Sequence, residues 1–308
     1  ANVTCVRNQD FRSKERTVQY SSLNCSSSIS SSIKQQNRPC AGGVGRWFDV
    51  GFEVLGVPFV KYFQVCYNVE TLSVIYSEHD LLGGSIEKAQ INNNRPSFRV
   101  GGLKSKIRFP STYTQNSQKA RLESLLGSAE LANKYISSSS FFARGHLTPD
   151  GDAVLNTWAG ATYFYINVAP EWQVINVGNW VRVENAARKV AARLNDTVKI
   201  FTGVYDVLTL PDVRGRPVPI TLTETNQVEA PKWIWKVVHH PASDSAIALV
   251  TLNNPFADSR EKPLCNNICA ENGWDQQEFQ DLRKGFTFCC TVRDLRKVIS
   301  FIPTKADA

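Results

Sequence analysis

The sequence contains no methionine, and it contains no long run of apolar residues. No stretch approaches the roughly 18 consecutive apolar residues of a membrane-spanning helix, so we expect a soluble protein with no membrane partner. Hydrophobic residues make up 42% and charged residues 20% of the chain, which excludes a wholly disordered, collagenous or coiled-coil protein. The length of 308 residues allows one large domain or two modest ones.

The missing methionine also bears on where the protein acts. Because translation starts with Met and the sequence starts at Ala1, we interpret the original start as removed. Neither a signal peptide nor a transit peptide is visible, which favours a mature secreted protein. Acceptor sequons for N-glycosylation begin at Asn2, Asn24 and Asn195, so we expect an extracellular glycoprotein.

The eight cysteines form two clusters near opposite ends of the chain. In an oxidising compartment such cysteines are expected to form disulfides. Four cysteines allow three pairings within each cluster, so the connectivity stays open. The disulfide candidates are Cys5, Cys25, Cys40 and Cys66 in the first cluster and Cys265, Cys269, Cys289 and Cys290 in the second.

A zinc site is the alternative interpretation of the second cluster, with His239 and His240 as further ligands. Adjacent Cys289 and Cys290 cannot easily join one small tetrahedral site, and the sequence has no CxxC pair. Disulfides are therefore the favoured interpretation. We expect both histidines, and His79, to be structural.

The first forty-odd residues differ in character from the rest. They contain the serine-rich tract Ser26–Ser32, and six basic against two acidic residues give them a charge of +4, over half of the net +7. We interpret residues 1–45 as a small basic extension tied by disulfides, with the glycine-rich residues 41–45 as its exit.

Short runs of β-branched and aromatic residues dominate the remaining chain and predict strands at residues 59–69, 71–76, 162–168, 199–207, 232–238 and 246–252, the first two as a hairpin. Helices are predicted at Gln118–Tyr135 and Trp180–Leu194. The second has the clearest apolar face, formed by Val183, Ala187, Val190, Ala191 and Leu194. Strands mixed with helices in no strict βαβ order predict an α+β fold.

A basic stretch from Arg95 to Arg121 contains seven Lys or Arg residues and no Asp or Glu, with Phe98, Phe109 and Tyr113 among them. Cations interleaved with aromatic rings suit a polyphosphate backbone, where binding comes largely from counterion release. The simpler alternative is a solvated basic face. The candidate nucleic-acid contacts are Arg99, Lys104, Lys106 and Arg108.

The next group of residues has the chemistry of a hydrolytic site. His146, within Arg-Gly-His, can accept a proton from water near neutral pH. Asn176 offers a neutral oxygen to a hard cation that keeps most of its waters. Trp180, Glu184 and Arg188 are spaced by four and therefore follow one side of the predicted helix. Each residue alone has a structural explanation, such as a helix cap or a surface ion pair.

Taken in order, these motifs resemble the active-site signature of the DNA/RNA non-specific endonucleases, the ββα-metal nucleases that include endonuclease G. The similarity extends from about residue 46 to the C-terminus, and residues 95–98, 161–165, 263–265 and 289–290 resemble the secreted arthropod branch that includes the duplex-specific nucleases. The matching motif residues are Arg144, Gly145, His146, Asn167, Pro170, Asn176, Gly178, Trp180, Glu184 and Arg188.

The resemblance implies a fold and an activity. The fold is α+β, with a ββα-metal (His-Me finger) nuclease core on a central, mostly antiparallel sheet in residues 46–308 and the small extension before it. The activity is that of a secreted, Mg²⁺-dependent, sequence-non-specific endonuclease, which cleaves DNA, with RNA as a further candidate substrate, and leaves 5′-phosphates. One divalent ion is implied, Mn²⁺ being a possible substitute for Mg²⁺, and no protein partner is.

The resemblance also assigns roles to single residues. His146 is the general base, and Asn176 is the direct protein ligand of the ion. Glu184 holds a water bound to the ion, while Asn167 and Trp180 support the site.

Arginines are expected to bind the phosphate. Arg144 and Arg188 contact its oxygens as charge develops. A further arginine upstream contacts the transition state in this family, and Arg95 is the first choice, with Arg99 as the alternative.

Two positions depart from the family pattern. Many members have Asp where this chain has Ala143, which removes a carboxylate beside Arg144. The motif's Gln is Glu171 here, which adds a negative charge near the site.

A secreted basic protein that captures nucleic acid without cleaving it is the alternative function. It accounts for the charge but gives no reason for His146, Asn176 and Glu184 in that order.

Overall fold

The computed structural model describes residues 3–7, 10–13, 16–19, 29–89 and 95–307. The chain divides into two compact units, Ala1–Ser30 and Ser31–Ala308. The first unit contains a three-stranded antiparallel sheet of β1 (Val3–Arg7), β2 (Asp10–Ser13) and β3 (Arg16–Gln19).

The division lies earlier than the predicted boundary at residue 45. The reason is that β4 (Ser31–Cys40) pairs with β5 (Gly45–Phe52) and so belongs to the sheet of the larger unit. Its sequence is mostly polar because it is an edge strand with many exposed side chains.

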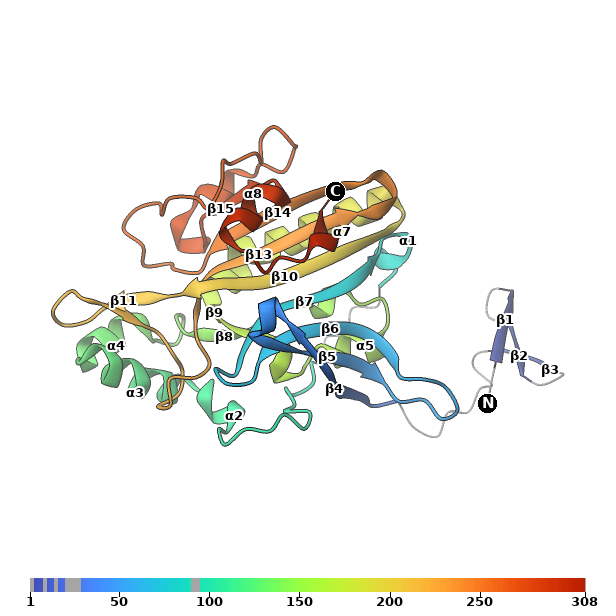
Figure 1. The fold of residues 1–308 in the computed structure, drawn as a ribbon, viewed down its shortest axis with the longest axis horizontal. Helices are drawn as coiled ribbons and strands as arrows, with labels where there is room; N and C mark the ends of the chain where they lie inside the picture. Colours follow the sequence, from blue (N-terminus) through green and yellow to red (C-terminus); the bar gives the residue numbers. More distant parts are fainter. Residues whose placement is uncertain (1–2, 8–9, 14–15, 20–28, 90–94, 308) are drawn as a thin grey trace. The chain divides into compact units, whose positions relative to one another are not determined.

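An eight-stranded antiparallel sheet forms the centre of the larger unit, in the order β15-β14-β13-β10-β7-β6-β5-β4 (Figure 1). Strands β6 and β7 form the predicted hairpin, and the strands predicted near residues 199–207, 232–238 and 246–252 are β10, β13 and β14. The further bounds are β6 Val60–Asn68, β7 Ser73–Leu82, β10 Thr197–Val207, β13 Pro231–His240, β14 Ser245–Leu252 and β15 Thr287–Cys290.

The sheet has an apolar core on each face because neighbouring residues of a strand point to opposite sides. On β5, Trp47 belongs to one core cluster and Phe48 to the other. Helix α8 (Val292–Val298) packs into the first cluster. Helix α7 (Val181–Leu194) packs into the second, together with a separate hairpin of β8 (Phe142–His146) and β9 (Val168–Trp172).

A row of polar residues crosses the sheet on the α7 face. Ser77 of β7 pairs in register with Thr202 of β10, which pairs in turn with Lys236 of β13, and all three are fully buried. His79 lies two residues further along β7 and is buried as well. Such a row inside a core requires polar partners on the layer that covers it.

The helices that precede the β8–β9 hairpin differ from the prediction. The helix expected over Gln118–Tyr135 is two helices, α3 (Gln115–Leu126) and α4 (Ala129–Tyr135). Gly127, at φ +73°, ends the first, and the Ser128 side chain caps the second. The remaining elements include α1 Gly83–Ile86, α2 Phe109–Thr112, α5 Asn156–Ala161, α6 Gln173–Ile175, β11 Thr209–Pro211 and β12 Pro217–Pro219.

The strand predicted at residues 162–168 is wrong. A 3₁₀ turn occupies Tyr165–Asn167, and β9 starts only at Val168. The Asn167 side chain holds the turn by donating to the carbonyls of Thr148 and Thr162, at 2.8 and 3.0 Å. The aromatic side chains of this segment are buried, which explains its strand-like composition.

Six cysteines form three disulfides, so the zinc interpretation is wrong. Cys40 on β4 pairs with Cys66 on β6. On β15, Cys290 pairs with Cys265 and Cys289 pairs with Cys269. Cys25 and the side chain of Cys5 lie outside the described residues. Within the described part of the chain, no helix combines the length and apolar character needed to cross a bilayer.

The Cys40–Cys66 disulfide should contribute to stability because it restricts the unfolded chain. The double variant Cys40→Ala/Cys66→Ala is expected to lose about 2–4 kcal/mol of unfolding free energy. Urea denaturation followed by tryptophan fluorescence measures the loss. An unchanged midpoint and slope would contradict the prediction.

Candidate active site

The predicted motif residues, from Arg144 to Arg188, lie on a ββα unit, in which the β8–β9 hairpin is followed by α7. In the hairpin, His146 pairs with Val168 and Gly145 with Ala169. The Asn253 side chain anchors β9 because its oxygen accepts from the Trp172 amide at 2.9 Å and its nitrogen donates to the Pro170 carbonyl at 3.0 Å. The hairpin therefore has a fixed position on the sheet.

His146 ends β8 with its ring among aromatic neighbours. The ring centroid lies 5.0 Å from that of Phe98 and 4.8 Å from that of Tyr163. Burial lowers the pKa of His146 to about 4, with Asp150 opposing this effect and Arg95 adding to it. The imidazole is therefore neutral at physiological pH, and its Nε2 has no hydrogen-bond partner among the described residues. A neutral, unengaged nitrogen is what a general base requires.

Arg144 lies against three aromatic rings. Its guanidinium carbon is 5.2 Å from the ring centroid of Tyr113, 5.7 Å from Phe98 and 5.9 Å from Tyr165, and Nη2 donates to the Pro110 carbonyl at 3.3 Å. These cation–π contacts orient the guanidinium. They hold Arg144 in place on β8, where the family pattern has an aspartate at position 143 and this chain has Ala143.

Asn167 shapes the loop that follows His146. Besides the two bonds that its nitrogen donates, its oxygen accepts from the Thr148 amide at 2.9 Å. The side chain is fully buried and engaged at both ends, so its role in the described structure is to hold the loop.

Asn176 begins a five-residue π-helical turn, Asn176–Trp180, that leads into α7. Gly178 has non-helical torsions (φ −94°, ψ −118°), and a Cβ there would lie 2.8 Å from the Lys284 carbonyl oxygen, so only glycine fits. The Asn176 side chain is partly exposed and forms no hydrogen bond with the residues that the structure describes. Its amide oxygen is available to a ligand.

Glu184 and Arg188 follow on α7, one turn apart. Arg188 Nη2 lies 3.9 Å from Glu184 Oε2, and Nη1 donates to Asp152 Oδ1 at 2.6 Å. Burial raises the pKa of Glu184 to about 7, although Lys236 and Arg188 oppose the rise. Trp180, one turn earlier, is fully buried, and its ring centroid is 5.3 Å from Lys236 Nζ.

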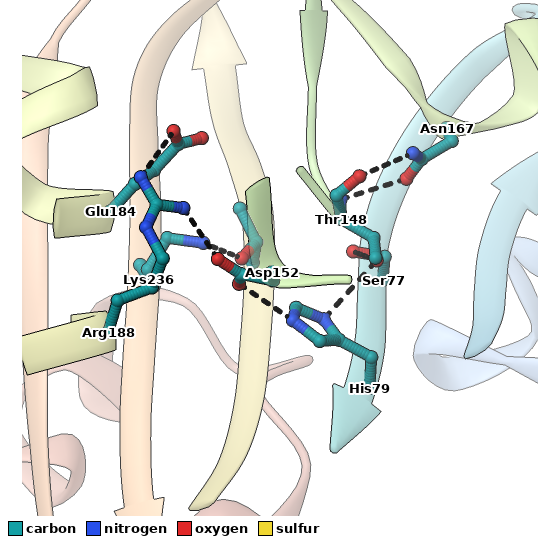
Figure 2. A network of polar contacts seen from close by, with 9 residues as sticks. Ser77, His79, Thr148, Asp152, Asn167, Glu184, Arg188 and Lys236 are labelled. Atoms are coloured by element: carbon teal, nitrogen blue, oxygen red, sulfur yellow. Dashed lines mark hydrogen bonds and ion pairs between the residues drawn. The ribbon is translucent and has the colours of Figure 1, made fainter. Parts of the chain in front are cut away.

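A buried network that the sequence does not predict supports these residues (Figure 2). Asp152 accepts from Arg188 on one side and lies 2.9 Å from His79 Nε2 on the other. Burial alone would raise the pKa of Asp152, but the hydrogen bond of His79 and the charge of Arg188 lower it to about 2. Lys236 belongs to the same cluster and donates to Thr202 Oγ1 at 2.6 Å.

Two signals in the sequence could have indicated this network. Lys236 is a single charge inside an apolar strand run, and a buried lysine needs anionic neighbours. Asp152 follows the Arg-Gly-His motif closely in the chain. Neither signal identifies the partners, since His79 comes from a strand more than sixty residues away.

The basic stretch contains arginines and lysines in different environments. Arg99 is engaged in the fold because it donates to Ser31 and the Gly160 carbonyl and stacks 4.0 Å from the Phe164 ring centroid. Lys104, Lys106 and Arg108 are exposed and form no ion pair within the described residues.

Arg95 lies close to the candidate base. Its side chain is 76% exposed, and Nε is 3.7 Å from Asp150 Oδ2. Asp150 also accepts from the Tyr163 hydroxyl at 2.6 Å, and the charges of Arg95 and Asp150 both affect the His146 pKa. A cavity of about 180 Å³ opens here, lined by residues that include Arg95, Asp150, Asn156 and Tyr163. These contacts favour Arg95 over Arg99 as the arginine of the site.

The oxygen donors of the unit fit a hydrated divalent ion. No group of three or more His, Cys, Asp or Glu side chains is arranged to hold a metal within the described ranges. The free amide of Asn176 and the carboxylate of Glu184 are hard donors, which suit a cation that retains much of its water. Such an ion would be held by few protein atoms.

Replacing Asp152 should test the buried network. Asp152→Asn is expected to lower stability at pH 7 by about 3 kcal/mol or more, because it leaves the Arg188 charge without its partner. Asp80→Asn, which breaks the exposed pair with Lys199 at 3.0 Å, should cost under about 1 kcal/mol. Urea unfolding measures both, and equal losses would contradict the prediction.

The pH dependence has a defined sign. The folded-state pKa of Asp152 is depressed to about 2. Its ionised carboxylate therefore contributes to the free energy of unfolding above the unfolded-state pKa of about 4, and this contribution is lost as pH falls towards 2. Asp152→Asn should lack this part of the acid transition.

The chain is similar to known endonucleases. The family model described as DNA/RNA non-specific endonuclease matches residues 43–295. A salivary endonuclease of Lutzomyia longipalpis is 30% identical over 298 residues, covering 96% of this chain and 68% of the relative. A salivary endonuclease of Culex quinquefasciatus is 31% identical over 276 residues, covering 85% of this chain and 67% of the relative. A solved EndoG/EndoGI complex aligns at a TM-score of 0.41 with 17% identity, covering 68% of this chain and 78% of that one.

The family match spans both the sheet and the ββα unit, and the relatives align over most of the chain. The predicted α+β class, with a ββα unit on an antiparallel sheet, is confirmed. These findings leave no support for the alternative of a binding protein without catalysis. The chain belongs to the DNA/RNA non-specific endonuclease family and is a nuclease that hydrolyses nucleic acid.

Proposed function

We propose that this chain is a secreted, Mg²⁺-dependent endonuclease that cleaves DNA, with RNA as a further substrate, without sequence preference and leaves 5′-phosphates. The observation that carries the proposal is the neutral His146, whose Nε2 is unengaged within the described residues, on the hairpin that precedes Asn176 and Glu184. Secretion is supported by three disulfides and by the similarity to salivary proteins.

His146 acts as the general base in this proposal. It takes a proton from a water whose oxygen attacks phosphorus, in line with the leaving 3′ oxygen. The bond from phosphorus to that oxygen breaks, and the oxygen takes a proton from solvent. The products carry a 5′-phosphate and a 3′-hydroxyl.

Asn176 holds the divalent ion, and Glu184 orients water around it. When bound, the ion stabilises the charge that develops on the phosphate and the leaving oxygen. Mn²⁺ is an expected substitute because it accepts the same oxygen donors.

The arginines bind phosphate oxygens. Arg144 is held in place by its aromatic neighbours, and Arg188 by Asp152, so both guanidinium groups are oriented before substrate arrives. Arg95, exposed beside the base, contacts the transition state. Lys104, Lys106 and Arg108 extend the contact along the nucleic-acid backbone, which carries no base information.

Removing the base should stop cleavage and preserve binding. His146→Ala is expected to lower the rate of plasmid cleavage about 10²–10⁴-fold, while the dissociation constant for DNA stays almost unchanged. His240→Ala, on the β13–β14 hairpin, is the matched control and should cleave normally. Near wild-type cleavage by the His146 variant would remove the basis of the proposal.

The ion dependence is tested at Asn176. A chelator should stop wild-type cleavage, and Asn176→Ala should need at least about tenfold more Mg²⁺ for half-maximal rate. Asn266→Ala, at an exposed position near the C-terminal disulfides, should keep the wild-type requirement. Cleavage that persists in excess chelator would contradict a role for the ion.

A further inference from the structure

Asp150 is a carboxylate beside the candidate base that the mechanism above does not use. It is the first residue of a 3₁₀ turn that also contains Asp152, just after the strand that carries His146. Asp152 is engaged with Arg188 and His79. The Asp150 side chain is 30% exposed and lines the cavity of the site. One acid of the turn therefore belongs to the buried network, and the other lies where the reaction takes place.

Tyr163 connects this carboxylate with the base. Its ring lies edge-on to the imidazole of His146, with the two ring centroids 4.8 Å apart, and its hydroxyl donates to Asp150 Oδ2 at 2.6 Å. Burial and this hydrogen bond raise the pKa of the Tyr163 hydroxyl, so the group stays protonated and remains a donor. A short hydrogen bond to a charged acceptor is among the stronger ones in proteins. The carboxylate therefore has a fixed place, one side chain away from the imidazole.

The charged groups around His146 have opposite effects on it. Arg95 Nε lies 3.7 Å from the same Asp150 oxygen, and Arg144 contacts the Phe98 ring that also contacts His146. Burial and the charge of Arg95 lower the pKa of His146, whereas the charge of Asp150 raises it. Of these groups, Asp150 is the one whose charge favours a protonated imidazole.

A protonated imidazole is what the proposed reaction creates. His146 gains a positive charge as it takes the proton from water, in surroundings where burial and Arg95 disfavour that charge. A carboxylate that is already in place stabilises the charge without rearranging during the reaction. Once a phosphate group engages Arg95, the negative charge of the phosphate offsets that of the guanidinium. Asp150 then acts on the base with less opposition.

We propose that Asp150, held by Tyr163, is a positioning residue for the reaction and stabilises the positive charge that His146 gains in the transition state. The inference rests on the proposed function, which makes His146 the base. Asp150 acts through His146 and does not touch the substrate. Removing its charge should therefore slow proton transfer. Phosphate binding should not suffer, because a negative charge beside Arg95 repels phosphate.

Steady-state cleavage of a short DNA duplex with Mg²⁺ separates these two effects. Asp150→Asn is expected to lower kcat at least about threefold at pH 7, with KM unchanged or lower. Asp150→Glu, which keeps the charge, should recover part of the lost kcat. Asp294→Asn is the matched control, because Asp294 is a partly exposed carboxylate that pairs with Lys297 at 2.7 Å on α8, and it should leave both constants unchanged.

Proton NMR of the protein without nucleic acid or metal gives a second readout. The chain has four histidines, so the His146 ring signal is identified by its absence from a His146→Gln variant. Asp150→Asn should lower the His146 pKa by at least about 0.5, and Arg95→Gln should raise it, since the two charges act in opposite directions. The wild-type pKa is about 4, so the protonated fractions are compared at pH 4.

The outcomes separate the inference from the proposed function. Asp150→Asn should fold, because the amide oxygen still accepts from Tyr163, and its melting temperature checks this. An unchanged kcat, an unchanged His146 titration or a loss that lies wholly in KM would overturn the role of Asp150 and leave His146 as the base. A His146→Ala variant that cleaves DNA normally would instead overturn the proposed function.

Discussion

The ion pair between Asp152 and Arg188 is the interaction on which the geometry of the site depends. Asp152 follows the β8 strand that carries His146, and Arg188 belongs to the helix that carries Glu184. The pair therefore joins the two halves of the ββα unit, and His79 fixes it to the central sheet (Figure 2). Because the carboxylate is buried, the arrangement is stable only while both partners are present.

The sheet beneath explains how such charges are tolerated. Most of its inward-facing side chains are apolar, but the row of Ser77, Thr202 and Lys236 crosses three central strands in register. Ser77 accepts a hydrogen bond from Thr148 in the layer above, and the charge of Lys236 acts on Asp152 and Glu184 in that layer. Arg144, by contrast, is held by aromatic rings, so one site combines two ways of orienting a guanidinium group.

Sequence reasoning predicted the parts of the fold that depend on local periodicity. The α7 helix and the central strands were predicted within a few residues because their buried apolar residues repeat at the period of a helix or of a strand. The polar edge strand β4 was missed because its side chains are mostly exposed, and the turn at Asn167 was misread because buried aromatic residues resemble a strand. Motif order located the ββα unit, but Asp152 and His79 meet only through tertiary packing, which no local pattern encodes.

The disulfides have a consequence for the sheet as a whole. Its two outer strands are β4 and β15, and each is tied: β4 through Cys40 to β6, and β15 through Cys289 and Cys290 to the preceding loop. The Asn267 side chain accepts from the Cys289 amide at 3.1 Å and holds that loop along the β15 margin. Peeling of a sheet begins at its margins, where strands have only one neighbour. Covalent bonds at both margins would make local opening of the sheet rarer and would therefore slow any cleavage that requires the opened state.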